Sequence, residues 1–462
     1  MEIVRLVEEK VLSVTAKVLG ILQGEVSYQY FEMTLKKELD GFGCEILKLV
    51  LEELDREIKA DKARKKQWAV VRKNDKSVLT PFGTVNYERT YYRHKESNKY
   101  SYLVDQKAGF KPRVRISENL KAELVDASAV MSYENATVEL SRYNEELKVS
   151  KQTVGNYIRG FEAKEVPVPE EKRKVKVLYI EADEDHIKVR GRKKKTMAKL
   201  VYLHEGVSGG KRKKLINTRH FTTVNKKPDE LWYEIAEYIY QHYDVDSIEK
   251  IFLSADGASW IKVGLNYIYD ATFVLDKFHL SKSIKTATEH AKALKKQIYR
   301  GICDLDQEKV LSNLKKAHQQ AEGVARQKRI IDTAKYIRNN WDGIEAQIKH
   351  PEVGCSAEGH VSHVLSARMS SRPMAWSSAG AESMTQVRAV RANGESVKEH
   401  YLARQEEAPV IVELKQTVKE ELKRLQNKKP IGKVDTHNIP LLNGPDNLTR
   451  KALRGLSDCL AV

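Results

Sequence analysis

Residues 175–186 read VKVLYIEADEDH, an apolar run that ends in a cluster of acids. A short run of this kind, rich in Val, Leu and Ile, is typical of a buried strand. A helical pattern over residues 228–243 separates the third strand candidate from the fourth. The sequence therefore predicts an α/β sheet whose first three strands precede the first helix. The strand candidates after the first are residues 198–204, 217–222, 250–254 and 271–275.

The order of these elements narrows the fold further. Three strands in a row do not fit a doubly wound sheet, and the chain contains neither GxGxxG nor GxxxxGK[ST]. The order β-β-β-α-β-α-β matches a ribonuclease H-like mixed sheet instead. Residues 281–350 are rich in Lys, Gln and Ala and predict a helical insertion. An α/β pattern resumes after the insertion, in residues 351–400.

Two acids follow predicted strands of this sheet. Asp183 ends the first strand and Asp256 ends the fourth, so the fold would place their carboxylates side by side. Two half-buried carboxylates repel each other unless a cation holds them together. Mg²⁺ prefers such oxygen ligands, and two ions about 3.5–4 Å apart can hold both reacting oxygens of a phosphodiester. Either acid alone fits a turn-forming residue, whereas the pair favours metal ligation.

A third acid from a later helix would complete such a site, and two residues are candidates. Glu358 opens the predicted helix AEGHVSHVLSARM, which ends near Arg368 and Arg372. Glu382 lies in the stretch SSAGAESMTQVRAVRA. The basic, hydroxyl-rich surroundings of the first helix suit a helix that faces phosphate.

The composition indicates a polyanionic partner. The chain of 462 residues has 81 Lys and Arg against 64 Asp and Glu, a formal charge of +17. Nucleic acid is the usual partner of so basic a chain, although Lys-rich surfaces can also serve solubility alone. No apolar run approaches the ~18–20 residues of a membrane helix, and the first ten residues do not resemble a signal peptide. With four separated cysteines and no CxxC pair, the sequence predicts a cytoplasmic protein without disulfides or membrane contact.

A pair of helices is predicted ahead of the sheet. The first covers residues 133–144, and the second begins after the N-cap Ser150. Val154 and Ile158 would bury the second helix against the first. This is the pattern of a helix-turn-helix, whose second helix can enter a major groove, although many helix pairs bind nothing. The residues left on its outer side, our candidates for DNA contact, are Lys151, Gln152, Asn156 and Arg159.

Two basic runs fall in predicted turns beside the first strands. They are RGRKKK at residues 190–195 and KRKK at residues 211–214. Arg192, Lys193 and Lys194 of the first run would contact DNA phosphates or stay solvated.

The linker VPVPEE at residues 166–171 and the changes of periodicity divide the chain into segments. The N-terminal helices are candidates for pairing protomers, and the β unit holds aromatics and arginines that could contact nucleic acid or pack a small sheet. The predicted segments are N-terminal helices (1–75), a small β unit (76–115), the helix-turn-helix (116–163), the first part of the core (164–280), the helical insertion (281–350), the last part of the core (351–400) and a helical tail (401–462).

Four stretches together resemble the transposases of bacterial insertion sequences of the Lre type, relatives of the mutator-like DDE transposases: YIEADEDH, the ADG of LSADGASWI, LDKFHL and CSAEGHVSHVLSARMSSRPMAWS. The resemblance runs over nearly the whole chain, and the CSAEGHVSH block is specific. It implies a ribonuclease H-like core with an Asp-Asp-Glu triad at Asp183, Asp256 and Glu358. These three residues would hold two divalent ions, Mg²⁺ or Mn²⁺.

The same resemblance bears on the residues around the triad. Related families place the Glu ahead of a helix that continues to an Arg and a later Trp, an order that Arg368 and Trp376 fit, so Glu358 is preferred to Glu382. Trp376 could stack on a base or fill the core. The stretch from Asp276 to His279 matches the family's Cys/Asp-x-x-His signature. This pair could hydrogen-bond beside the site, either for structure or for catalysis.

The resemblance also implies an activity and partners. A transposase of this kind cleaves DNA at the ends of its element, and the freed 3′-hydroxyl attacks target DNA. Its partners would be terminal inverted repeats and target DNA, and at least a dimer is expected because two ends must be joined. It would lie in the bacterial cytoplasm, on the nucleoid when bound to DNA. Two other classes stay open: another ribonuclease H-like nuclease, and a non-enzymatic helix-turn-helix protein such as an inactive transposase copy.

Overall fold

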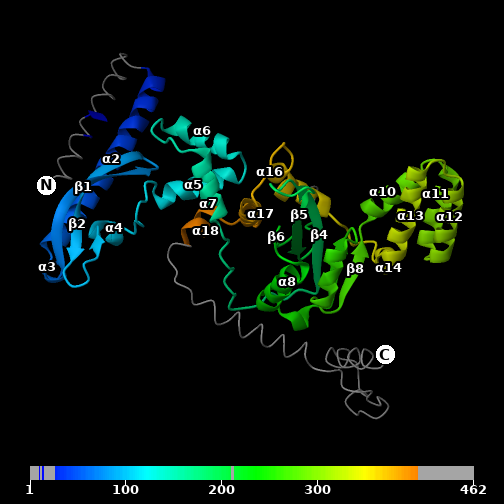
Figure 1. Ribbon diagram of the computed structural model, residues 1–462. Coiled ribbons are helices and arrows are strands. Elements are labelled where there is room, and N and C mark those ends of the chain that lie inside the picture. Colours follow the sequence, from blue (N-terminus) through cyan, green and yellow to red (C-terminus); the bar gives the residue numbers. More distant parts are fainter. Residues whose placement is uncertain (1–9, 11–12, 15–26, 210–212, 404–462) are drawn as a thin grey trace, which may run out of the picture.

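The computed structural model describes residues 10, 13, 14, 27–209 and 213–403 (Figure 1). It is an α/β structure in which an N-terminal unit, a group of short helices, a mixed sheet and a group of longer helices follow one another along the molecule (Figure 1). The predicted tail from residue 404 onward and most of residues 1–26 lie outside the described residues. No helix of the described part is both long and apolar enough to cross a membrane.

The N-terminal unit pairs a long helix with a β-hairpin. Helix α2 (Tyr28–Ala60) and the short α3 (Lys62–Gln67) lead into β1 (Trp68–Thr80) and β2 (Gly83–His94). The prediction that helices extend to residue 75 was wrong: β1 already begins at Trp68, and β-branched Val70 and Val71 favour the strand. The short β3 (Tyr100–Ser101) adds a third strand, and α4 (Leu103–Lys107) covers the hairpin.

Three short helices follow: α5 (Glu118–Ser128), α6 (Tyr133–Tyr143) and α7 (Lys151–Arg159). Both helices of the predicted pair are confirmed, and the Ser150 hydroxyl accepts a hydrogen bond from the Thr153 backbone N–H at 3.1 Å, as an N-cap should. Val154 and Ile158 are fully buried. Ala122 and Val125 of α5 and Ile158 of α7 belong to the same hydrophobic cluster as the buried residues of 357–401, so these helices are packed onto the core.

The central sheet has five strands in the order β6-β5-β4-β7-β8. Strand β4 runs parallel to β7 and antiparallel to β5, while β7 and β8 are parallel, so the sheet is mixed as predicted. All five predicted strands are present, with bounds that differ by a few residues, and α8 (Pro228–His242) separates the third from the fourth. The strands are β4 (Val177–Ile187), β5 (Thr196–His204), β6 (Arg219–Thr223), β7 (Lys250–Ala255) and β8 (Ala271–Leu275).

The largest hydrophobic cluster lies on one face of β4. Leu178, Ile180 and Ala182 alternate along the strand and pack with residues of α8 and of the helices after β8. Residues 281–350 are helical, as predicted. The helices after β7 are α9 (Ser259–Lys262), α10 (Lys277–Ala287), α11 (Lys292–Cys303), α12 (Gln307–Gln319), α13 (Val324–Asn339) and α14 (Trp341–Lys349).

Residues 351–400 contain no strand, so the prediction that an α/β pattern resumes there was wrong. The segment is α15 (Ala357–Val361), a π-helical turn (Ser362–Ser366), α16 (Ala367–Met369), α17 (Ser378–Ala392) and α18 (Val397–Ala403). Its apolar residues form a second core with the far end of β4 and with β5. Small residues such as Ala and Ser allow close helix packing there and weakened the periodicity of the sequence.

Candidate active site at the carboxyl ends of the parallel strands

Three aspartates form one row across the parallel strands. In the register of the sheet, Ala182 of β4 lies opposite Ala255 of β7, and Ala255 lies opposite Leu275 of β8. The next residue on each strand is an aspartate: Asp183, Asp256 and Asp276. Neighbouring strands lie about 4.8 Å apart, so this register brings the three carboxyl groups to one edge of the pairing. The prediction that Asp183 ends its strand was wrong, because β4 continues along β5 to Ile187.

The charge of one aspartate acts on its neighbour in this row. Burial raises the pKa of Asp183 most, the negative charge of Asp256 adds to the increase, and the resulting pKa is about 6. A hydrogen bond from the Glu184 backbone N–H to Asp183 Oδ1, at 2.8 Å, offsets part of the increase. Two like charges in a half-buried position are destabilising without a counter-charge.

Replacing Asp183 with Asn should therefore stabilise the metal-free protein. The folded pKa of about 6 lies above the unfolded value, so this carboxyl favours folding at acid pH and opposes it as the pH rises through 6. At pH 7 we expect Asp183→Asn to raise the free energy of unfolding by roughly 1–3 kcal/mol, and the gain should vanish near pH 4. Thermal unfolding of both proteins in EDTA, at pH 7 and pH 4, would measure it. A stability loss at pH 7 would contradict this interpretation.

The loop that carries Asp256 is fixed from two sides. Asp256 Oδ1 accepts a hydrogen bond from the Ala258 backbone N–H at 2.9 Å, and the Tyr336 hydroxyl of α13 donates to the Asp256 carbonyl at 2.8 Å. Gly257 has φ +90°, and a Cβ atom at this position would lie only 2.4 Å from Asn340 Oδ1. The helical insertion thus supports this loop directly, and Gly257 is required for both its conformation and its closeness to Asn340.

Asp276 and His279 form the hydrogen-bonded pair that the sequence suggested. Asp276 caps α10 by accepting from the Phe278 backbone N–H at 3.0 Å, and its other oxygen lies 2.6 Å from His279 Nδ1. The hydrogen bond to Asp276 raises the pKa of His279, and the charges of Asp256 and Asp183 raise it further. Burial raises the pKa of Asp276, but the His279 and Phe278 hydrogen bonds outweigh it and the net pKa is lowered. When protonated, the His279 ring is a local counter-charge for the aspartates.

The two candidates for the third acid lie in different surroundings. Glu382 of α17 is engaged at the end of β6, where Oε2 accepts from the backbone N–H groups of Val224 and Asn225, both at 2.7 Å, and Oε1 accepts from the Thr223 hydroxyl at 2.9 Å. Glu358 is exposed in the first turn of α15, which packs against β4. The carboxylate of Glu382 is therefore held by hydrogen bonds, while the carboxylate of Glu358 is accessible.

The carboxylates at this site fit a hard divalent cation only in part, because two ligands are close together and a third is not. Asp183 and Asp256 offer carboxylate oxygens in a half-buried position where like charges are otherwise unfavourable. Within the described ranges, however, no three His, Cys, Asp or Glu side chains are close enough together to hold a metal ion. The structure thus brings together two of the three predicted ligands, and Glu358 is not joined to them.

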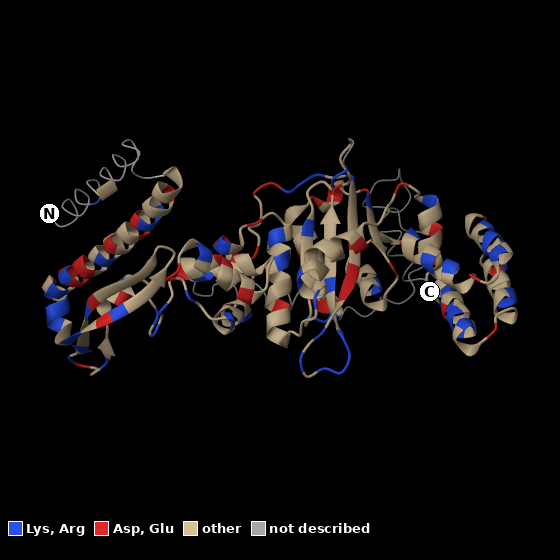
Figure 2. Ribbon diagram, turned by 90° about the horizontal axis from the view of Figure 1, so that it is seen from above, with Lys and Arg blue, Asp and Glu red and all other residues tan. Residues whose placement is uncertain are grey.

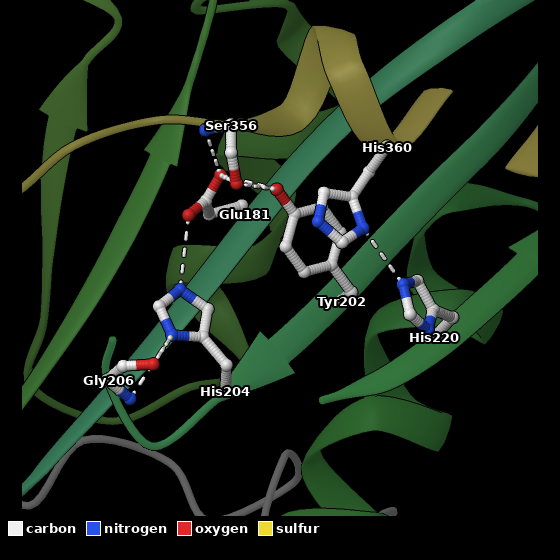
Figure 3. A network of polar contacts seen from close by, with 7 residues as sticks. All are labelled: Glu181, Tyr202, His204, Gly206, His220, Ser356 and His360. Atoms are coloured by element: carbon white, nitrogen blue, oxygen red, sulfur yellow. Dashed lines mark hydrogen bonds and ion pairs between the residues drawn. The ribbon is translucent and has the colours of Figure 1, made fainter. Parts of the chain in front are cut away.

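A buried polar network surrounds Glu181 (Figure 3). Glu181 stands two residues before Asp183 on β4, so the two side chains lie on the same face of the strand. Glu181 is only 4% exposed, and its carboxylate accepts from the Tyr202 hydroxyl at 2.5 Å and lies 3.1 Å from His204 Nε2. It also accepts from the backbone N–H and the hydroxyl of Ser356, directly before α15 (Figure 3). Burial raises the pKa of Glu181, but the hydrogen bonds from His204, Tyr202 and Ser356 lower it more, so the carboxylate stays ionised.

The start of α15 is held at a second point by aromatic rings. The His360 ring stacks on Tyr202 with centroids 4.1 Å apart, and His360 Nδ1 lies 3.0 Å from His220 Nε2 (Figure 3). Burial lowers the pKa of His220 to about 4 and also lowers the pKa of His360, so both rings are neutral at pH 7. Neutral rings can share one proton in this hydrogen bond. His360, the first histidine of the EGHVSH stretch, thus packs and hydrogen-bonds inside the fold.

The sequence did not predict this network, although one signal was present. Glu181 stands two residues before Asp183 in an otherwise apolar strand, so it had to point to the same face. A charged residue inside a buried strand needs a partner. Its partners come from residues 21 to 175 positions away, which no local pattern in the chain indicates.

Arg368 and Trp376 lie in the core. Trp376 is 7% exposed, and its indole N–H donates to the Met369 carbonyl at 3.0 Å. Arg368 Nε donates to the Ser128 carbonyl of α5 at 2.8 Å, and the guanidinium lies over the rings of Tyr133 and Trp376. These two residues hold the short helices against the core. Trp376 thus fills the core, one of the two roles considered for it.

The predicted DNA-contacting side chains are on the surface. Lys151, Gln152, Asn156 and Arg159 are all exposed along one side of α7, and Gln152 Nε2 and the Arg159 guanidinium both donate to Asn156 Oδ1. The basic run of residues 190–195 is also exposed and forms the turn between β4 and β5, with Arg192, Lys193 and Lys194 at its centre. Of the second basic run, residues 211 and 212 lie outside the described part of the chain.

Comparison with known proteins gives one family. The family model described as "Uncharacterised protein family (UPF0236)" matches residues 22–406. A UPF0236 protein of Caldanaerobacter subterraneus subsp. tengcongensis, whose name combines four locus designations, is 40% identical over 368 residues, 79% of this chain and 78% of the relative. Another from the same organism, with eleven locus designations in its name, is 39% identical over 368 residues, with the same coverage. A UPF0236 protein from the vanSb 3′ region of Streptococcus gallolyticus is 28% identical over 360 residues, 74% of this chain and 78% of the relative.

Proposed function

We propose that this chain, which belongs to the UPF0236 family, is a DNA transposase with a ribonuclease H-like core and an Asp-Asp-Glu site. The observation that carries the proposal is the register that sets Asp183 and Asp256 side by side where the parallel pairing of β4 and β7 ends, with the pKa of Asp183 raised by burial and by Asp256. The strand order, with a central strand parallel to one neighbour and antiparallel to the other, supports the same fold. The helical insertion before α15 also agrees with it.

The names of the relatives support a mobile element. Two relatives of one bacterium have names that combine four and eleven locus designations. A protein encoded at many loci of one genome is what repeated transposition of its gene would produce. A housekeeping nuclease or regulator would more often be encoded once.

The residues of the site would divide the chemistry among them. Asp183 and Asp256 would hold the divalent cation, Mg²⁺ or Mn²⁺, and Glu358 is our candidate for the third carboxylate. Such ions, when bound, polarise the scissile phosphate and activate water for in-line attack. His279, paired with Asp276, would compensate part of the negative charge that the aspartates bring to the site. Cleavage would free a 3′-hydroxyl, which would then attack target DNA at the same site.

A cleavage assay tests the proposal and the choice of third acid. The substrate is a duplex with the end of the DNA element that encodes this chain, incubated with Mg²⁺ or Mn²⁺. We expect Glu358→Gln to lower cleavage by roughly 10²-fold or more without loss of stability, because its carboxylate is accessible. Glu382→Gln should lower the melting temperature, because it disturbs four hydrogen bonds.

The outcomes of this assay separate the alternatives. Loss of cleavage in a stable Glu382→Gln protein, with an active Glu358→Gln protein, would overturn the assignment of Glu358. Cleavage without strand transfer would favour another ribonuclease H-like nuclease. DNA binding without any metal-dependent cleavage would leave a non-enzymatic DNA-binding protein.

Helix α7 would recognise the terminal inverted repeats. The amide groups of Gln152 and Asn156 are exposed on one face and can bind base edges, while Lys151 and Arg159 suit phosphates. We expect Gln152→Ala with Asn156→Ala to weaken binding to the element's end by roughly 10–100-fold and to leave binding to unrelated duplex unchanged. Fluorescence anisotropy with both duplexes would measure it. Val138→Ala on exposed α6 is the control, and equal weakening on both duplexes would contradict base recognition by α7.

A further inference from the structure

The N-terminal unit concentrates positive charge. Residues 61–100 hold eleven Lys and Arg but only four Asp and Glu, a far larger excess per residue than the chain as a whole has. Figure 2 shows this as blue ribbon around α3, at the end of the molecule farthest from the sheet. We use the term N-terminal cationic surface for six exposed side chains that form no ion pair within the described part of the chain: Lys62, Lys65, Lys66, Arg72, Arg93 and Lys99.

These side chains come together because α3 lies beside the turn between β2 and β3. The Lys95 backbone N–H donates to the Gln67 carbonyl at 2.9 Å, and Lys95 Nζ donates to the Lys65 carbonyl at 2.7 Å. Both ends of this contact are rich in Lys and Arg. The turn and the short helix are thus held side by side although both are basic, and a bound polyanion would relieve their mutual repulsion.

Arg72 is held at the surface by aromatic rings. It lies opposite Tyr91 in the β1–β2 register, and its guanidinium is 5.3 Å from the centre of the Tyr91 ring. Tyr91 stacks on Tyr100, which is 53% exposed, and Arg72 Nε donates to Asn74 Oδ1 at 3.1 Å. A guanidinium fixed in this way loses little freedom when it binds a phosphate.

The other end of the hairpin is fastened to the helix pair. Asn144, at the end of α6, donates to the Phe82 carbonyl at 2.9 Å, and Glu146 accepts from the Thr84 backbone N–H at 3.0 Å. Strand β1 has 13 residues, so at ~3.3 Å per residue the base of the hairpin, beside α3, lies roughly 40 Å from this tip and Arg72 roughly 30 Å from it. One turn of B-DNA rises about 34–36 Å. The hairpin is thus a spacer of about one helical turn.

We propose that the N-terminal cationic surface binds the phosphates of the same DNA duplex that α7 contacts, about one helical turn away. The inference rests on the proposed function, because it takes duplex DNA as the ligand. It extends the recognised end of the element beyond the site of α7. Phosphate contacts of this kind add affinity and orientation without reading the sequence.

Binding of the full chain to a duplex with the element's end, over a series of KCl concentrations, tests the inference. We expect the variant with Lys65→Glu, Lys66→Glu and Arg72→Glu to bind on the order of 10²-fold more weakly at 0.1 M salt. The slope of log affinity against log salt should fall by about 2–3, at roughly 0.9 per phosphate contact. In hydroxyl-radical footprints the outer protected tract should disappear while the tract at α7 stays. The control carries the same change of charge on α12 and α13, with Lys315→Glu, Lys316→Glu and Lys328→Glu, all exposed.

The outcomes distinguish the two proposals. A footprint of unchanged length, or equal weakening by the control, would overturn the second contact while leaving the transposase proposal intact. Failure of the wild-type chain to bind any duplex would overturn the proposed function itself. Tighter binding to duplex RNA than to DNA would contradict the ligand. The same three positions changed to Gln give a milder variant, expected to weaken binding in the same direction, if charge reversal impairs folding.

Discussion

Asp256→Asn should lower the rate of metal-dependent DNA strand cleavage by roughly 10³-fold or more, the largest loss of activity that we expect. The carboxylate stands beside Asp183 at the end of the β4–β7 pairing, and its backbone is fixed by Tyr336 and Ala258. Asn keeps the Oδ1 that accepts from Ala258 but loses the charge that would bind the cation. Losing a ligand of a catalytic metal removes several kcal/mol of transition-state stabilisation.

The control for this prediction is Asp270→Asn. Asp270 is an exposed aspartate just before β8, at the opposite end of the sheet, with φ +57°, a conformation that Asn also adopts readily. Its cleavage rate should stay within about twofold of the wild type, since it lies outside the site. DNA binding in EDTA should be the same for both variants. Full cleavage by Asp256→Asn would contradict the assignment of the site, and a loss of DNA binding would show that the substitution acts through the fold.

The aspartates were predictable from sequence because their position is local. A carboxylate directly after an apolar strand is visible in the sequence, and the order of strands says which ends meet. The register that pairs Ala182 with Ala255, and so sets Asp183 beside Asp256, is given only by the fold. The extent of β4 was not predictable, because pairing with β5 extends it to Ile187 through acidic residues that sequence alone assigns to a turn.

Sequence patterns alone could not distinguish the surroundings of Glu358 from those of Glu382. Both stand in helices rich in small and polar residues, and the resemblance favoured Glu358. Only the fold shows that the carboxylate of Glu382 is engaged by three consecutive residues at the end of β6. Residues 351–400 were predicted to be α/β because small residues weaken helical periodicity. In the fold the segment is helical, because tertiary packing outweighs the weak local pattern.

Glu181→Ala should be the most destabilising of these substitutions. The carboxylate is 4% exposed and is hydrogen-bonded to Tyr202, His204 and Ser356. Its removal leaves these buried groups without an acceptor and opens a cavity beside α15. We expect a loss of about 3–5 kcal/mol in the free energy of unfolding, and a fall of roughly 6–15 °C in melting temperature. Calorimetry or circular dichroism would measure both.

A surface glutamate provides the comparison. Glu249→Ala removes an exposed partner of Lys176, 3.0 Å away just before β4 and β7 begin, and should change stability by less than about 1 kcal/mol. An equally small effect of Glu181→Ala would mean that water replaces the carboxylate and that the network around Glu181 does not stabilise the fold.

The pH dependence of the Glu181 effect gives a sharper test. Because the folded pKa of Glu181 is lowered, its carboxylate stabilises the fold above the unfolded value near 4.3. This contribution is lost as the pH falls through the lower folded pKa. The stability difference between the wild type and Glu181→Gln should thus be full at pH 6 and shrink below about pH 4. A difference that is constant over this range would mean that packing of the side chain stabilises the fold. Its charge would then not be what holds Ser356 and the start of α15 against β4.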